Sequence, residues 1–167
     1  MTVVEEYWYG TKVRSDTFLT AYIDGASRGN PGPAAIGVLI EKDQRPLLEL
    51  CQYIGYSTNN VAEYTALITA IEEAIRLGGD HLFVLSDSQL LVRQMDGSYK
   101  VKNSHILPLF QRANSLCRRL KSFQIKHIER ALNSQANDLA ARIVKHYQSE
   151  RSNSGKSQSR LGGRSAG

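Results

Sequence analysis

The order of apolar patterns is the feature that most limits the folds open to this chain. Three apolar runs follow one another closely, and a run with helical spacing comes after them. Residues 18–24, 34–42 and 47–55 are rich in β-branched and other apolar residues, which is typical of strands. Between residues 59 and 77 the apolar residues instead recur every three or four positions, and Gly78-Gly79 follows, as at the end of an amphipathic helix. The pattern predicts an antiparallel strand unit followed by a helix.

The connectors between the three runs indicate tight turns. The first connector is the Gly- and Pro-rich segment GASRGNPGP, residues 25–33, which breaks both strand and helix. The second is a short polar stretch that ends with Arg45-Pro46, and its length fits an antiparallel hairpin.

The rest of the chain alternates between the two periods. Residues 81–87 and 123–129 are predicted as strands, and residues 88–95, 108–120 and 135–147 as helices. The resulting order, β-β-β-α-β-α-α-β-α, predicts an α/β fold. We expect a mixed five-stranded sheet, with three antiparallel strands and then parallel ones, and helices on both faces.

Charge and composition divide the chain into a domain and two ends. Residues 148–167 hold four basic residues and one acidic residue, a large part of the net charge of +5, together with six Ser and four Gly. Such a segment buries too little apolar surface to offset its ordering entropy. We therefore expect a short N-terminal extension over residues 1–17, one folded domain over residues 18–147, and a disordered basic tail over residues 148–167.

Composition also excludes several classes of protein. With 41% hydrophobic residues the chain is too apolar to be disordered, and it has no apolar run of about 18 residues that could span a bilayer. Cys51 and Cys117 are too few for a secreted disulfide scaffold, and the acidic N-terminus lacks the basic start of an export signal. We expect a cytoplasmic monomer without a membrane partner.

Three acidic residues stand where strand ends and a helix start bring side chains together. Asp24 ends the first strand, Asp87 ends the strand after the first helix, and Glu63 lies one turn inside that helix. Each alone is equally explained by a turn, a helix cap or a charge that complements the helix dipole. Converging carboxylates, however, raise one another's pKa and call for a cation such as Mg²⁺, which prefers oxygen ligands. The scattered histidines offer no competing zinc spacing.

Three motifs in this order resemble the type 1 ribonuclease H family: YIDGASRGNPGPA at residues 22–34, TNNVAEY at residues 58–64 and SDSQL at residues 86–90. The resemblance covers about residues 18–147. It implies the ribonuclease H fold and an endonuclease that cuts the RNA strand of an RNA/DNA hybrid, leaving 5′-phosphate and 3′-hydroxyl ends. It also implies two Mg²⁺ ions, with Mn²⁺ as a substitute, held by Asp24, Glu63, Asp87 and a fourth residue.

The fourth residue departs from the family pattern. The chain has RALNSQANDLA at residues 130–140, where the family resembles R-E-x-N-x-x-A-D-x-L-A. Alignment without a gap places Asn137, not Asp138, at the catalytic acid's position. A shift of one residue is a rotation of about 100° on a helix, so Asp138 cannot simply replace it. We expect an Asp-Glu-Asp-Asn site with weaker occupancy of one metal, and the alternative is a bulge that lets Asp138 reach it.

The resemblance also assigns roles to residues around the acids. Arg130 stands where many relatives carry a histidine, and its permanent charge suits it to hold the leaving group or the scissile phosphate. The positions that match the family's substrate contacts are Gly25, Arg28, Asn30, Thr58, Asn59, Asn60 and Gln89. For Thr58 and Asn59, helix capping is an equally good explanation.

The basic protrusion with which some relatives grip the hybrid is missing, because the connection between the second and third predicted helices has only the short segment GSYKVK, residues 97–102, in its place. The basic tail, or Arg118, Arg119 and Lys121, could compensate, although we favour a solvated helix end for these three. The main rival function is a non-catalytic module that binds hybrid or double-stranded RNA. A transposase or integrase core is a second rival, but we disfavour it because it would need a carboxylate on the last helix and large flanking domains.

Overall fold

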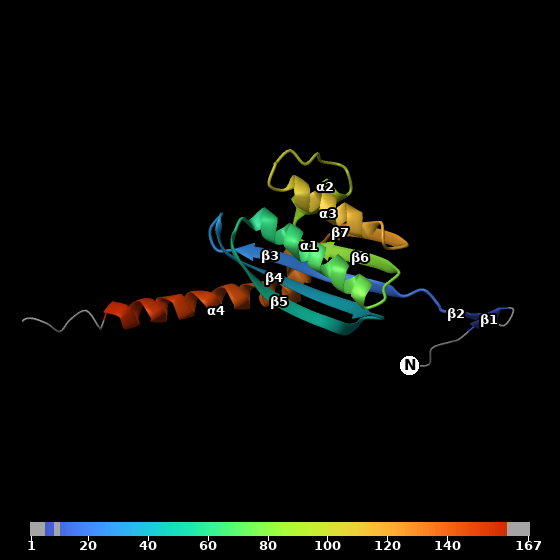
Figure 1. Cartoon of the computed structure of the whole chain (residues 1–167), viewed down its shortest axis with the longest axis horizontal. Helices are drawn as coiled ribbons and strands as arrows, with labels where there is room; N and C mark the ends of the chain where they lie inside the picture. The colour runs from blue at the N-terminus through green and yellow to red at the C-terminus, as the bar shows by residue number, and fades with distance from the viewer. Residues whose placement is uncertain (1–5, 9–10, 160–167) are drawn as a thin grey trace, which may run out of the picture.

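A mixed five-stranded sheet forms the centre of the protein (Figure 1). The structure, a computed structural model, describes residues 6–8 and 11–159, and of these the side chains of residues 14–151. The strand order is β5-β4-β3-β6-β7; β4 is antiparallel to β3 and β5, whereas β6 is parallel to β3 and to β7. The strands are β3 (Phe18–Ser27), β4 (Gly32–Lys42), β5 (Arg45–Ser57), β6 (His81–Ser86) and β7 (Ser122–His127). The predicted fold class is confirmed.

Helices cover both faces of the sheet (Figure 1). On one face lie α1 (Asn59–Arg76), α2 (Gln89–Met95) and α3 (Leu107–Cys117), and on the other lies α4 (Ser134–Ser159), preceded by the short 3-10 helix η1 (Arg130–Asn133). The alternation of β4 explains the division: Ile36, Val38 and Ile40 enter the core under α1, and Ala35, Gly37 and Leu39 face α4. Among the described residues, no helix combines the length and apolarity needed to cross a bilayer.

Two glycines let the helices approach the sheet backbone on opposite sides of Asp24. A Cβ at Gly25 would lie 2.2 Å from the backbone of Ala62 and Glu63 in α1, and a Cβ at Gly37 would lie 2.2 Å from the Ala136 carbonyl oxygen in α4. Asp24 and Gly37 are paired across β3 and β4. The end of β3 is therefore enclosed by both helices at the level of Asp24.

The turn between β4 and β5 differs from the predicted one. Asp43 and Gln44 have φ angles of 51° and 61° and form the two-residue connection, so Arg45-Pro46 already belongs to β5. Two successive residues with positive φ give the turn whose twist matches a hairpin. Pro46 is tolerated because β5 is an edge strand, where a missing N–H need not interrupt a ladder.

The last helix is longer than predicted. We expected it to end at Tyr147 and a disordered tail to begin at residue 148, but α4 continues to Ser159. Tyr147 stacks on Tyr53 of β5 with ring centroids 4.1 Å apart, which fixes this part of the helix to the sheet. Extension beyond that point adds one hydrogen bond per residue without a new nucleation cost. Residues 160–167 lie outside the described residues.

The expected N-terminal extension contains a small hairpin. Within residues 1–17, β1 (Glu6–Trp8) and β2 (Thr11–Val13) pair antiparallel in a sheet of their own. Sequence periodicity gave no indication of it, because strands of three residues are too short to show alternation.

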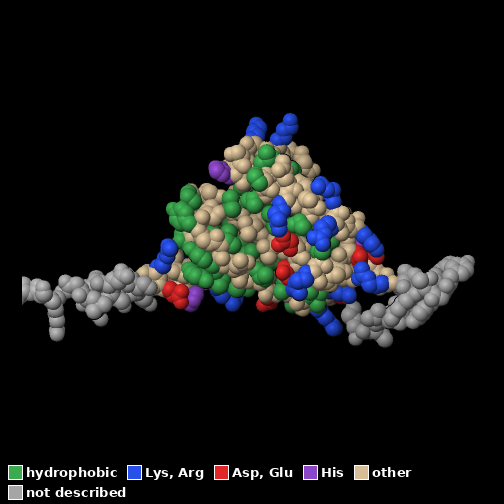
Figure 2. All heavy atoms as spheres, in the orientation of Figure 1, with side chains coloured by type: hydrophobic (Ala, Val, Ile, Leu, Met, Phe, Trp, Pro, Cys, Tyr) green, Lys and Arg blue, Asp and Glu red, His purple; other side chains and the backbone are tan. Residues whose placement is uncertain are grey.

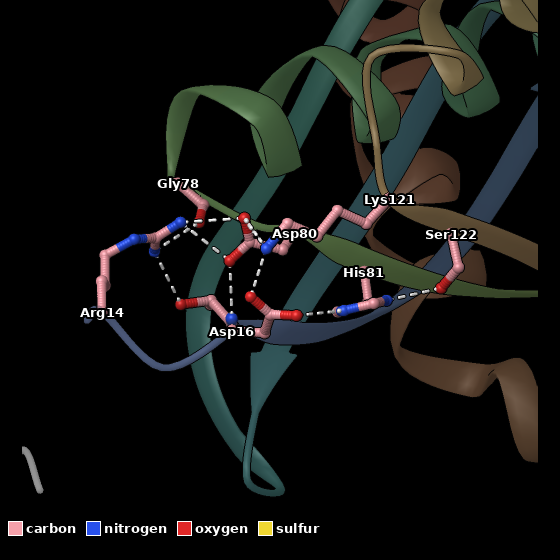
Figure 3. A network of polar contacts seen from close by, with 8 residues as sticks. Arg14, Asp16, Gly78, Asp80, His81, Lys121 and Ser122 are labelled. Carbon is pink, nitrogen blue, oxygen red and sulfur yellow. Dashed lines mark hydrogen bonds and ion pairs between the residues drawn. The ribbon is translucent and has the colours of Figure 1, made fainter. Parts of the chain in front are cut away.

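The segment before β3 is attached to the far end of the sheet by a polar network (Figure 3). The Arg14 guanidinium donates to both carboxylate oxygens of Asp80, at 2.9 and 2.8 Å, and the Thr17 N–H donates to Asp80 Oδ2 at 2.8 Å. Lys121 donates to Asp16, whose carboxylate also contacts His81 Nε2 at 3.0 Å. Acidic and basic side chains are correspondingly interspersed at this end of the molecule (Figure 2). Lys121 thus stabilises the attachment of this segment, and it lies away from the part of β3 that carries Asp24.

Asp80→Asn tests the contribution of this network to stability. The Thr17 N–H first, and the charges of Arg14 and Lys121 after it, hold the pKa of Asp80 below its ordinary value of 3.8. A lowered pKa means that the carboxylate stabilises the fold above about pH 4 and loses that effect as the pH falls further. We expect a lower Tm for Asp80→Asn at pH 7 in thermal unfolding, with the difference from wild type narrowing in acid. Glu49→Gln, at an exposed position on β5, is the matched control, and an equal effect of both variants would contradict this role.

Candidate active site

Three carboxylates converge where β3, α1 and β6 meet. One side-chain oxygen each of Asp24, Glu63 and Asp87 lies within 4.8 Å of the other two. The sheet explains the first and last: Ile23 is paired with Ser86 in the parallel ladder of β3 and β6, so Asp24 and Asp87 follow at neighbouring positions. Asp87 comes directly after β6, whereas Asp24 does not end its strand as predicted, because β3 stays paired with β4 as far as Ser27. The predicted convergence of these three acids is confirmed.

Glu63 reaches the other two because α1 touches β3 at Gly25. The Gly25 N–H donates to Glu63 Oε2 at 3.2 Å, which orients the carboxylate toward the strand end. At the start of the helix, Thr58 Oγ1 accepts the Val61 N–H at 3.2 Å and fixes where the first turn begins. The Thr58 cap and the contact at Gly25 therefore together fix the position of Glu63.

The site strongly disfavours negative charge when it holds no cation. Asp24 and Glu63 are each only 4% exposed. Burial, and then the neighbouring charge of Asp87, raise the pKa of Asp24 to about 7, against the opposing effects of Arg130 and the Gly25 N–H. Burial first, and then Asp24 and Asp87, raise the pKa of Glu63 well above its ordinary value. A divalent cation would remove this repulsion.

Two buried oxygens at the site have no donor among the described residues. They are Asp87 Oδ2 and Asn137 Oδ1. The nearest positive group to Asp87 Oδ2 is Arg130 Nη1, which at 3.8 Å is beyond hydrogen-bond distance and belongs to a largely exposed side chain. Buried acceptors normally have partners, so the unpaired oxygen of Asp87, together with the carboxylates of Asp24 and Glu63, forms a donor set suited to a hard cation.

Comparison with known proteins places the chain in a family. A family model described as "Reverse transcriptase-like" matches residues 22–143. The chain is 42% identical over 119 residues to the bifunctional protein Rv2228c of Mycobacterium tuberculosis, covering 70% of this chain and 33% of that protein. It is 43% identical over 121 residues to ribonuclease HI of Halobacterium salinarum, covering 72% of this chain and 61% of that protein. The chain belongs to the ribonuclease H family.

Solved structures of the ribonuclease H family share the fold. The N-terminal ribonuclease H domain of Rv2228c superimposes with a TM-score of 0.79 at 36% identity, over 81% of this chain and 99% of that one. LC11-RNase H1, solved in complex with an RNA/DNA hybrid, superimposes with a TM-score of 0.74 at 38% identity, over 78% of this chain and 99% of that one. The chain spans only about a third of the Rv2228c protein itself.

The fourth position of this ribonuclease H site lies at the start of α4. Asn137 donates from Nδ2 to the Arg130 carbonyl oxygen at 3.3 Å while its Oδ1 is buried, whereas the side chain of Asp138 is exposed. The geometry favours the alignment without a gap, and metal binding by Asn137 stays a prediction.

Sequence reasoning missed the positioning role of Asn133, which is buried and donates from Nδ2 to the Ile23 carbonyl oxygen at 2.8 Å. It ties η1 to the residue before Asp24.

The predicted substrate residues lie around the same end of the sheet. Asn30 Oδ1 accepts the Asn59 N–H at 3.1 Å, which joins the β3–β4 loop to the start of α1. Gln89 is exposed at the start of α2, and Arg28 is exposed in the loop and donates to Gln148 of α4. A pocket of about 480 Å³ brings together Asn30, Thr58 and Asn60 with three residues that sequence reasoning did not include: Tyr56, Asn103 and His105. Thr58 caps the helix as the structural alternative predicted, and the substrate contacts stay predictions.

Asp24→Asn tests the electrostatic cost of the site. Because the pKa of Asp24 is about 7 in the folded state and 3.8 ordinarily, the folded state holds this proton more tightly. Without metal, the contribution of Asp24 to the free energy of unfolding therefore falls as the pH rises from about 4 to about 7, and it is constant above about pH 7. We expect the neutral variant to be more stable than wild type at pH 8 in EDTA, by up to about 4 kcal/mol, and to show little gain at pH 4. Urea unfolding at both pH values measures this, and an equal gain at both would contradict it.

Proposed function

We propose that this chain is an endoribonuclease that hydrolyses the RNA strand of RNA/DNA hybrids in a metal-dependent reaction, leaving 5′-phosphate and 3′-hydroxyl ends. The observation that carries the proposal is the convergence of three largely buried carboxylates at one edge of a ribonuclease H sheet. A purely structural cluster would pair these oxygens with donors, but one oxygen of Asp87 has none among the described residues.

The donor set suits two divalent ions, Mg²⁺ or Mn²⁺. Asp24, Asp87 and Asn137 would hold one ion, and Asp24 and Glu63 the other. When bound, the ions supply an activated water and neutralise charge on the departing 3′ oxygen. Asn137 offers a neutral amide oxygen where a carboxylate would add charge, so we expect weaker metal binding at that position.

The chain's own residues prepare the site for this reaction. The Gly25 N–H holds Glu63 in place, and Asp24 is only 4% exposed, so bulk water is kept from it. Arg130 places a permanently charged, exposed guanidinium beside Asp87, where it can hold the scissile phosphate. Arg130 cannot act as a general base at neutral pH, so its contribution is electrostatic.

Hybrid recognition requires contacts to 2′-hydroxyls on one strand and to the backbone of the other. The β3–β4 loop and the start of α1 are joined through Asn30 and Asn59, so they present their polar groups as one surface beside the carboxylates. We propose that this surface binds the minor groove of the hybrid. The residues involved are Gly25, Arg28, Asn30, Thr58, Asn59, Asn60 and Gln89. The relative solved with an RNA/DNA hybrid supports this choice of ligand.

The alternative is a module that binds hybrid or double-stranded RNA without cutting it. Asn137 motivates this alternative because it removes one negative charge from the metal site. The intact set of Asp24, Glu63 and Asp87 favours catalysis.

One cleavage assay tests the proposal and the identity of the fourth residue together. Wild type, Asp24→Asn, Asn137→Asp and Asp138→Ala are compared on a hybrid whose RNA strand carries a 5′ label, with Mg²⁺. We expect cutting by wild type and a loss of at least about 10³-fold for Asp24→Asn, because this carboxylate contacts both ions. Asn137→Asp should need less Mg²⁺ for half-maximal rate, and Asp138→Ala should match wild type.

The outcomes separate the alternatives. Hybrid binding without cleavage at any Mg²⁺ or Mn²⁺ concentration would establish the binding module. Loss of activity only in Asp138→Ala would show that Asp138 fills the fourth position. If wild type cleaved single-stranded RNA of the same sequence as fast as the hybrid, the activity would be that of a general ribonuclease rather than a hybrid-specific one.

A further inference from the structure

A second pocket lies beside the carboxylate site, between the end of β3 and the middle of α4. It has a volume of about 260 Å³, and its walls are Ala26, Ser27, Arg28, Ala141, Val144 and Lys145. Figure 1 shows that α4 leaves the domain at the end of the sheet that carries the β3–β4 loop. The pocket therefore continues the surface of the proposed active site toward α4.

Two cations at this pocket are matched to an anion. Ser27 forms part of the wall, and its Oγ is buried and does not serve as a donor to the pocket. Lys145 is exposed at the rim, and no ion pair or hydrogen bond holds its ammonium within the described part of the chain. Arg28, the second cation of the pocket, donates to Gln148, so its guanidinium is held next to α4. A phosphate group in the pocket would accept from both cations.

We propose that this pocket binds a backbone phosphate of the nucleic acid at a distance from the cleaved bond, and this inference rests on the proposed function. Ser27 is three residues beyond Asp24 on the same strand, which is about 10 Å along β3. At 3.4 Å of rise per nucleotide, that distance is roughly three nucleotides along one strand of the duplex. The pocket thus supplies a grip that a basic protrusion provides in some relatives.

The anchoring of α4 to the sheet and to the β3–β4 loop positions this site. Tyr147 is stacked on Tyr53, and Gln148 contacts Arg28, so the turn of α4 that carries Lys145 is fixed to the sheet and the loop at once. Ala141 and Val144 leave room between the helix and Ser27 because neither fills the space with a long side chain. The Arg28 guanidinium and the backbone that carries Lys145 are therefore in place before the nucleic acid binds, which reduces the ordering cost of the contact.

Salt-dependent binding of a hybrid distinguishes this role from a general effect of charge. Lys145→Gln is compared with wild type and with Lys42→Gln, which removes the same charge at the far end of β4. In EDTA, we expect Lys145→Gln to lower the slope of log K against log[salt] by about 1 on a long hybrid, as for one lost phosphate contact. Lys42→Gln should leave the slope unchanged. Cleavage by Lys145→Gln should show a raised KM and an unchanged kcat.

A shortened hybrid gives the positional test. When the hybrid is cut back so that no phosphate lies beyond about two nucleotides from the cleaved bond, Lys145→Gln and wild type should bind alike. The inference would be overturned if Lys145→Gln weakened binding equally on long and short hybrids. It would also be overturned if Lys145→Gln and Lys42→Gln had the same slope of log K against log[salt]. Binding of inorganic phosphate at Lys145, with no effect of the variant on the long hybrid, would also overturn it and make this a site for a free phosphate compound.

The proposed function is tested separately by the wild type. If wild type binds and cuts the hybrid while Lys145→Gln matches Lys42→Gln, only the pocket inference fails. If wild type binds no hybrid at all, both fail. Thermal unfolding of each variant shows whether a change in binding reflects loss of the fold, and we expect equal Tm values because Lys145 is exposed.

Discussion

The backbone contact between α1 and β3 at Gly25 is the constraint on which the site depends. No side chain fits there, so the helix lies against the strand and brings Glu63 to Asp24. On the opposite face, Gly37 allows the same close approach by α4, and it is paired with Asp24 across the sheet. The buried carboxylates, their raised pKa values and the unpaired oxygens all follow from this enclosure.

Helix α4 connects the proposed chemistry to the proposed grip on substrate. Its first turns carry Asn137 and pack on Gly37, and the turns that follow place Lys145 beside the β3–β4 loop. Asn133 fastens the segment before it to β3 through the Ile23 carbonyl. A shift of this helix along its axis would therefore move the fourth metal-site position and the anion pocket together.

Periodicity predicted the sheet and its helices because each strand and helix buries one face, and the spacing of apolar residues shows which face is buried. The three carboxylates were predictable because strand ends meet at one edge of a sheet. Other features depend on contacts between distant segments. Gln148 reaches Arg28 and Tyr147 stacks on Tyr53, and neither contact is visible in a local pattern, so a tail of Ser and Gly was expected where a helix continues. The turn at Asp43-Gln44 was missed because it contains no glycine.

The central claim is that the carboxylates enclosed by α1, β3 and β6 form a divalent-cation site. Anomalous diffraction from crystals of the protein grown with Mn²⁺ tests it most directly, because the signal locates the ion without reference to activity. We expect a peak within coordination distance of oxygens from Asp24, Glu63 and Asp87, with Asn137 Oδ1 on the same side. Mn²⁺ bound only elsewhere, with Arg130 closing on Asp87 as an ion pair, would contradict the account.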